Sequence, residues 1–203
     1  MEHLRASDDV MRALVEQHGV LSVRQWARRP GRPRDPYGIL VRSIVGQQLS
    51  TRAANTIYGR VLDLFGGDVP TPAQLIAADP EALRAAGLSR AKVVYLRDLA
   101  ERVEDGELDL ERLKELSDDQ VTEQLTAVKG IGQWSADMFL IFQLGRPDVL
   151  AVGDLGIRRA VERAYALKKI PDAKTITRIA EPWRPYRSLA CLYLWASLQA
   201  APV

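Results

Sequence analysis

The residues of this 203-residue chain that could do chemistry lie between two helical patterns and just before a third. One pattern runs into Lys129-Gly130-Ile131-Gly132, and the next starts at Gln133. Glycines at such a junction let the backbone take a positive φ and let another group approach closely. A tight turn that leads into a helix N-terminus also directs unpaired amide N–H groups outward, where they suit a phosphate oxygen. The pattern predicts a helix-hairpin-helix turn over residues 128–133, with Ile131 packed into the core.

The same turn also fits an ordinary pair of helices joined by glycine caps, because a single G-x-G is weak evidence. In the phosphate-binding interpretation, the amides near Gly130 and Gly132 would make a sequence-independent contact that fixes the register on DNA. An exposed Lys129 would add positive charge to the same contact.

One aspartate, Asp154, stands at the expected start of a helix, directly after Val149–Gly153. Aspartate in this position is usually a helix cap. A carboxylate that accepts amide hydrogen bonds stays charged, so it could also lie beneath a sugar ring. There it could stabilise positive charge at the anomeric carbon or assist an attacking water, because glycosyl transfer passes through an oxocarbenium-like transition state.

Three large side chains accompany these residues. Trp134 and Met138 are spaced i, i+4 on the helix after the turn, and Trp195 lies in the last helical segment. Residues of this type and spacing more often belong to a core. Two tryptophans that line one cleft could instead stack on an extracted base, which contributes about 1–3 kcal/mol per base.

Composition excludes several classes of site and location. The chain has one cysteine, Cys191, and two histidines, so an intrachain disulfide and a four-cysteine zinc or iron–sulfur site are excluded. We expect no metal site built from side chains. No apolar run is long enough to span a membrane, and the polar N-terminus has no signal-peptide character. We therefore expect a cytoplasmic protein that does not bind membranes. Nothing in the sequence requires more than a monomer, so a monomer is expected.

Charge is distributed unevenly although its sum is only +2. Arginines gather between Arg24 and Arg34, including the basic loop Arg28–Arg34, whereas the stretch from Glu101 to Asp119 is largely acidic. Such a surface suits a polyanion on one face. A solvated face with incidental charge fits the same pattern equally well.

Helix start signals recur along the chain, and no run alternates like a strand. A capping residue followed by proline marks three starts, at Asp35, Thr71 and Asp79. Ser50 and Ser89 are expected caps, and Ser117 with Gln120 fits a capping box. The sequence predicts an all-α fold of roughly ten short helices, with helical segments expected at 8–17, 21–27, 35–47, 50–65, 89–103, 117–127, 133–144, 154–166 and 186–199.

The run Gly130–Ala136 with Asp154, preceded by Ile44–Ser50, resembles the helix-hairpin-helix (HhH-GPD) DNA glycosylase superfamily. The nearest similarity within it is to the AlkA-type 3-methyladenine DNA glycosylase II branch. The resemblance covers about residues 36–200, and only the motifs taken together are specific. It implies an all-α fold of two helical lobes around a DNA-binding cleft, within a single unit 1–203. The central lobe would be 36–145, with the hairpin at 128–133, and the second lobe would join 1–35 to 146–203.

The resemblance also implies a role for each matching position. Asp154 would be the catalytic residue, Trp134, Met138 and Trp195 would form the base pocket, and Gln47, Gln48 and Leu49 would form a minor-groove wedge. The phosphate-binding residues would be Lys129, Gly130, Ile131, Gly132 and Gln133. No cofactor would be required, although a monovalent cation could bind hairpin backbone carbonyls near Val128.

The function that this resemblance implies is excision of alkylated bases, of the 3-methyladenine and 7-methylguanine type, from double-stranded DNA. The base would be flipped out and the N-glycosidic bond hydrolysed, leaving an abasic site for base excision repair. The enzyme would act in the cytoplasm, associated with the nucleoid in a bacterium. A non-catalytic helix-hairpin-helix DNA-binding module is the alternative, and a helical protein-interaction domain would show no salt-dependent DNA affinity.

The chain departs from the family pattern at four of these positions. Lys129 replaces a usual proline, Met138 replaces a tyrosine of the AlkA type, and Gln48 stands in register with a wedge leucine, so that Gln48 or Leu49 would insert. Relatives that also cut the DNA backbone carry a lysine where this chain has Trp134. The resemblance therefore implies a monofunctional enzyme that uses water as its nucleophile.

Overall fold

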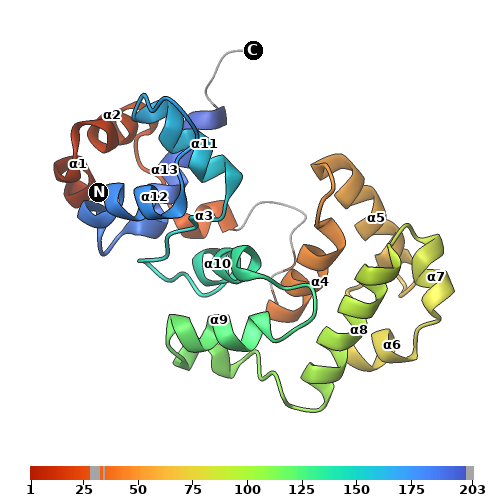
Figure 1. Cartoon of the computed structure of the whole chain (residues 1–203). Coiled ribbons are helices and arrows are strands. Elements are labelled where there is room, and N and C mark those ends of the chain that lie inside the picture. Colours follow the sequence, from red (N-terminus) through yellow and green to blue (C-terminus); the bar gives the residue numbers. More distant parts are fainter. Residues whose placement is uncertain (28–32, 34, 200–203) are drawn as a thin grey trace. The chain divides into compact units, whose positions relative to one another are not determined.

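The computed structural model describes residues 1–27, 33 and 35–199, and every regular element among them is helical (Figure 1). The all-α prediction is confirmed. None of the helices in these residues is both long and apolar enough to cross a membrane. The basic loop predicted at Arg28–Arg34 lies outside the described residues, apart from Pro33.

The elements follow one another with short connections. In chain order they are α1 (Glu2–Ser7), α2 (Asp9–His18), α3 (Val23–Ala27), α4 (Pro36–Gly46), α5 (Thr51–Asp63), α6 (Pro72–Ala77), α7 (Pro80–Ala85), α8 (Arg90–Glu104), the 3-10 helix η1 (Arg112–Glu115), α9 (Asp118–Thr126), α10 (Gln133–Phe142), α11 (Leu155–Ala164), α12 (Ala173–Ile179), the 3-10 helix η2 (Glu181–Trp183) and α13 (Arg187–Gln199).

Backbone contacts divide the chain into two compact units. The central unit is Pro30–Ala136, and the terminal unit joins Met1–Arg29 to Asp137–Val203. The second boundary falls inside α10, so Trp134 belongs to the central unit and Met138 to the terminal unit. The lobes expected from the sequence, 36–145 and 1–35 plus 146–203 within a single unit 1–203, place that boundary after α10, and this division stays a prediction.

The central unit is built around α8. This helix packs against α4, α6 and α7, and α4 packs against α5. The buried side of α8 presents Leu96 and Leu99, which have no exposed surface. Ser89 begins the helix by accepting a hydrogen bond from the amide of Lys92 at 3.2 Å, as its sequence predicts. Helix α8 is therefore the central element against which α4, α6 and α7 pack.

The terminal unit is built around α13, which contacts α2, α3 and α11. Its segment 190–194 is fully buried, which suits a central helix in a small bundle. A partly buried polar cluster ties this unit together: Oδ2 of Asp8 accepts hydrogen bonds from the Tyr165 hydroxyl at 2.9 Å and from Nε1 of Trp183 at 3.0 Å. The N-terminal helices and the C-terminal segment are thereby joined within one core.

Candidate functional site

The predicted hairpin is present in the central unit, between α9 and α10 (Figure 1). Gly130 has φ +80°, and a Cβ at this position would overlap the ring of Tyr95 on α8. Ile131 is only 5% exposed, so it packs into the core as predicted. The expectation of a special glycine is confirmed at Gly130 but wrong at Gly132, whose φ lies outside the left-handed region and whose Cβ would meet nothing within 4 Å.

Lys129 has an acidic partner that the sequence analysis did not foresee. Its amide donates to Oδ2 of Asp98 at 2.9 Å, and its Nζ lies 3.0 Å from Oδ1 of the same carboxylate. Burial works to raise the pKa of Asp98, but the hydrogen bonds from Lys129 and Arg102 lower it more, so this pKa lies below its ordinary value. The charge of Lys129 is therefore offset by Asp98, and phosphate binding would depend mainly on the hairpin amides.

The predicted wedge residues lie in the turn between α4 and α5, also in the central unit. Gln47 does not point outward with the other two, because its Nε2 donates to the carbonyl of Gly130 at 2.7 Å. Gln48 is exposed and has φ +58°, the left-handed region that is uncommon for a residue other than glycine. Leu49 is 36% exposed. The turn therefore presents Gln48 and Leu49, and ties Gln47 to the hairpin.

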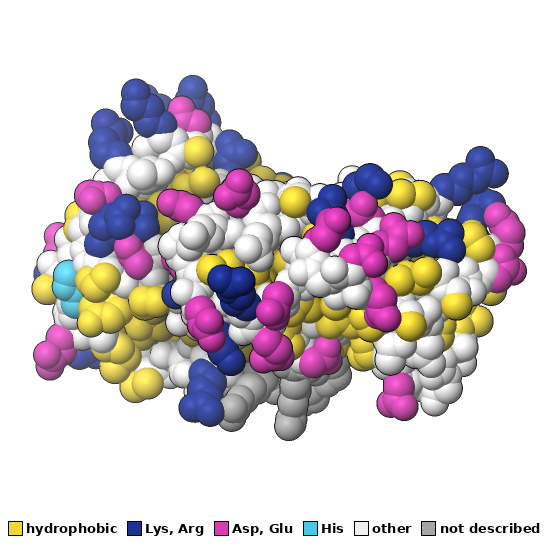
Figure 2. Space-filling view, turned by 90° about the horizontal axis from the view of Figure 1, so that it is seen from below, with side chains coloured by type: hydrophobic (Ala, Val, Ile, Leu, Met, Phe, Trp, Pro, Cys, Tyr) yellow, Lys and Arg dark blue, Asp and Glu magenta, His cyan; other side chains and the backbone are white. Residues whose placement is uncertain are grey.

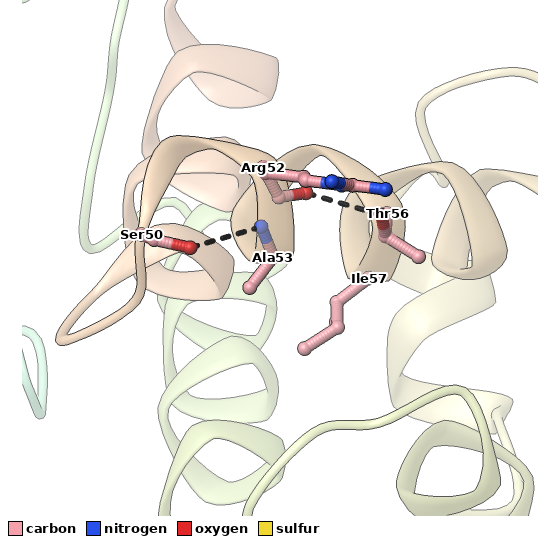
Figure 3. A pocket seen from close by; sticks show the side chains of 5 residues that line it. All are labelled: Ser50, Arg52, Ala53, Thr56 and Ile57. Carbon is pink, nitrogen blue, oxygen red and sulfur yellow. Dashed lines mark hydrogen bonds between the residues drawn. The ribbon is translucent and has the colours of Figure 1, made fainter.

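An open hollow of about 340 Å³ lies on the first turns of α5 and is lined by Ser50, Arg52, Ala53, Thr56 and Ile57. Figure 3 shows the hydroxyl of Ser50 capping the amide of Ala53, and the Thr56 hydroxyl bonded to the carbonyl of Arg52. Both hydroxyls thus serve the helix itself. The hollow contains no acid–base pair, so it does not supply a catalytic site.

Asp154 lies in the terminal unit and caps α11. Its Oδ1 accepts a hydrogen bond from the amide of Ile157 at 2.8 Å and a second from Nε1 of Trp195 at 2.9 Å. The helix-cap interpretation is therefore correct. It is compatible with a chemical role, because two donors on one oxygen fix the orientation of the carboxylate.

Aromatic rings accompany this carboxylate. The ring of Trp195 lies 5.6 Å from the ring of Phe142, centroid to centroid, with 33° between their planes. Phe142 was missed by the sequence analysis, although it continues the i, i+4 series of Trp134 and Met138 on α10. Met138 is half-buried in the terminal unit, and Trp134 is 44% exposed in the central unit.

The connector between α10 and α11, which leads to Asp154, is held in place by residues near the start of α13. The Ser188 hydroxyl donates to the carbonyl of Arg146 at 2.7 Å and accepts from the amide of Val149 at 2.9 Å. Arg187 binds the Asp148 carboxylate through Nε at 2.6 Å and through Nη2 at 3.0 Å. Because the same helix carries Trp195, α13 positions both the carboxylate and its indole partner.

Charge on the surface does not by itself mark a nucleic-acid face. Figure 2 shows Lys and Arg side chains interspersed with Asp and Glu on the side in view. Several cations of the described residues are paired on their own helix, as Arg84 is with Glu81 at 3.1 Å. Among the described residues no group of three or more His, Cys, Asp or Glu side chains could hold a metal ion.

Comparison with known proteins gives consistent matches along the chain. The family described as HhH-GPD superfamily base excision DNA repair protein matches residues 41–185. DNA-3-methyladenine glycosylase 1 of Schizosaccharomyces pombe is 35% identical over 98% of this chain and 86% of its own length.

Solved structures also match almost the whole chain. A DNA-3-methyladenine glycosidase from Bacillus halodurans has a TM-score of 0.85 and 41% identity, covering 98% of this chain and 88% of that one. The S. pombe 3-methyladenine DNA glycosylase Mag1, in complex with abasic DNA, has a TM-score of 0.85 and 35% identity, covering 98% of this chain and 96% of that one. The chain therefore belongs to the HhH-GPD superfamily of base excision DNA repair proteins.

Proposed function

We propose that this protein is a DNA glycosylase that removes alkylated bases, of the 3-methyladenine and 7-methylguanine type, from double-stranded DNA and leaves an abasic site. The observation that carries the proposal is the Asp154 carboxylate, held at Oδ1 by a helix amide and by the indole of Trp195. Trp195 in turn lies against Phe142, which gives aromatic surface beside the carboxylate. The names of the relatives reported above support the same activity.

Asp154 would act on the sugar rather than on the base. As the bond between the anomeric carbon and the base nitrogen breaks, its electron pair leaves with the base and positive charge develops on the sugar. A fixed carboxylate stabilises that charge and orients a water, which adds to the anomeric carbon and gives up its proton to the same carboxylate. Because a methylated purine is already cationic, it leaves without a general acid.

DNA binding would divide between two loops of the central unit. The amides near Gly130 and Gly132 would bind a phosphate, which fixes register without reading sequence. Gln48 and Leu49, exposed at the turn, would fill the gap left by the flipped nucleotide. Flipping costs a few kcal/mol and least for a damaged base, which favours lesions. The chain would act as a monomer in the cytoplasm, at the nucleoid in a bacterium.

A monovalent cation fits the hairpin backbone as an accessory to phosphate binding. The carbonyl of Val128 accepts one hydrogen bond, from the amide of Ile131 at 3.1 Å. A carbonyl oxygen has two lone pairs, so this one retains an acceptor site for a cation. The cation would supply positive charge close to the bound phosphate.

The proposal includes hydrolysis without cleavage of the DNA backbone. A lyase needs an amine nucleophile, and position 134 holds tryptophan, while the ammonium of Lys129 is paired with Asp98. The test measures base release from a methylated duplex. The product is then divided and analysed for strand breakage before and after alkali treatment. We expect strand breakage only after alkali. Breakage without alkali would contradict a monofunctional enzyme, and binding without base release would favour a non-catalytic module.

Gly156 should be essential to the geometry of the site. A Cβ at Gly156 would lie 2.8 Å from Oδ1 of Asp154 and 3.3 Å from Cδ1 of Trp195, so one of the two must move. We expect Gly156→Ala to lower single-turnover base release about tenfold or more, since small misplacements of reacting groups have large effects on rate. The matched control is Gly153→Ala, whose Cβ meets nothing within 4 Å; equal rates for the two variants would contradict the prediction.

A further inference from the structure

One face of α8 contacts both loops that the proposed function places on DNA. Lys92, Tyr95 and Asp98 follow at intervals of three along the helix, and residues three or four apart share a helix face. Lys92 binds the main chain before Gln48, Tyr95 lies against Gly130, and Asp98 binds Lys129. All of these residues belong to the central unit.

Lys92, on α8, caps the C-terminal end of α4, where the turn begins. Its Nζ donates to the carbonyl of Val45 at 2.8 Å and to the carbonyl of Gln47 at 2.7 Å. The last carbonyls of a helix have no partner within it, and positive charge is favoured at that end by the helix dipole. Burial of this ammonium lowers the pKa of Lys92. With both carbonyls fixed, the chain reverses at Gln48 in the left-handed region.

Gln47 links the turn to the hairpin through two hydrogen bonds. Its carbonyl accepts from Lys92, and its side-chain amide donates to the carbonyl of Gly130 at 2.7 Å. These two hydrogen bonds span 45 and 83 residues of sequence. One residue therefore links the turn that would enter the DNA to the hairpin that would hold its phosphate.

We propose that Lys92 is a positioning residue for the exposed turn at Gln48 and Leu49. By capping α4 and fixing Gln47, it holds this turn at a set distance from the hairpin, so that phosphate binding and insertion occur together. Its ammonium faces two main-chain carbonyls of the protein, and it acts on DNA through the turn. This role rests on the proposed function.

The proposal predicts different effects on two affinities, one for an intact duplex and one for a duplex with a stable abasic analogue. Both are measured by binding, without base release. Hairpin contacts to phosphate do not depend on a lesion, whereas insertion of the turn favours a duplex that contains a gap. We expect Lys92→Met to lower the preference for a duplex with a stable abasic analogue, over the intact duplex, by about tenfold or more. Affinity for the intact duplex should change by less than about threefold, because the phosphate contact is retained.

Three further variants make the test specific. Arg90→Met removes an exposed cation from the same helix and should leave the preference unchanged. Gln47→Leu should lower it in the same direction as Lys92→Met, without removing a charge. In a Gln48→Ala, Leu49→Ala background, Lys92→Met should have no further effect, because residues that act through one another are not additive. Thermal unfolding of each variant confirms that binding is measured on folded protein.

The outcomes distinguish this role from its rivals. Equal loss of affinity for both duplexes, an effect of Arg90→Met as large as that of Lys92→Met, or an additive effect in the double-alanine background would overturn it. Base release is measured on the same samples. Wild type that prefers the abasic analogue through Lys92 but releases no base would overturn the proposed glycosylase activity alone.

Discussion

Asp154→Asn is expected to lower single-turnover base release by about 10²–10³-fold or more, the range seen when one charge-stabilising group is removed from an active site. Asparagine is as good a helix cap as aspartate, and its amide oxygen can still accept from the amide of Ile157 and from Nε1 of Trp195. The negative charge is lost while these two hydrogen bonds are kept. DNA affinity and the thermal unfolding midpoint should therefore stay close to wild type, which gel-shift titration and thermal melts would check.

Asp172→Asn is the matched control for this change. Asp172 caps the neighbouring helix α12 and accepts from the amide of Thr175 at 2.8 Å, so the same substitution is made at the same kind of cap in the same unit. It should leave base release unchanged. If Asp154→Asn retained the wild-type rate, the carboxylate would be a cap alone and the proposed mechanism would be wrong.

The helices that the sequence predicted well are those whose start is decided by neighbouring residues. Asp35, Ser50 and Ser89 each accept from an amide three residues ahead, and both members of the capping box at Ser117 and Gln120 are in place. Such contacts are local, so a short stretch of sequence suffices to foresee them.

The elements that were missed lack these signals. Helix α1 has no side-chain hydrogen bond at its cap, Met1, and the 3-10 helix η1 also has none at Glu111. Both contain a residue without exposed surface, Leu4 and Leu113 respectively. The burial of these two leucines depends on how the chain packs, which no capping residue signals in the sequence.

The same distinction holds in the candidate site. The cap bond of Asp154 to Ile157 is local and was predicted, whereas its bond to Trp195 joins residues 41 positions apart. The partners of Lys129 and Gln47 lie 31 and 83 positions away and were not foreseen. Sequence reasoning identified which residue types matter. The contacts that orient them depend on which helices pack together.

Gly130→Ala should be the most destabilising single-methyl change in the hairpin. An L-residue in the left-handed region costs about 1–2 kcal/mol, and overlap of the new Cβ with the ring of Tyr95 adds about 1–3 kcal/mol of overpacking. The free energy of unfolding should fall by about 2–5 kcal/mol, which lowers the midpoint by roughly 2–4 °C per kcal/mol in a chain of this size. Because Gly130 also binds Gln47, DNA affinity measured below the midpoint should weaken as well.

Two variants separate the backbone cost from the steric cost. Gly132→Ala adds the same methyl group two residues away, where φ is ordinary and nothing lies within 4 Å, and should change stability by less than about 0.5 kcal/mol. In a Tyr95→Ala background the ring is gone, so Gly130→Ala should cost only the backbone part, about 1–2 kcal/mol. An unchanged cost in that background would mean that Tyr95 yields freely and that backbone conformation alone requires glycine. Equal costs for Gly130→Ala and Gly132→Ala would instead mean that the hairpin adapts to either methyl group, and the close approach of α8 would not be what holds it in place.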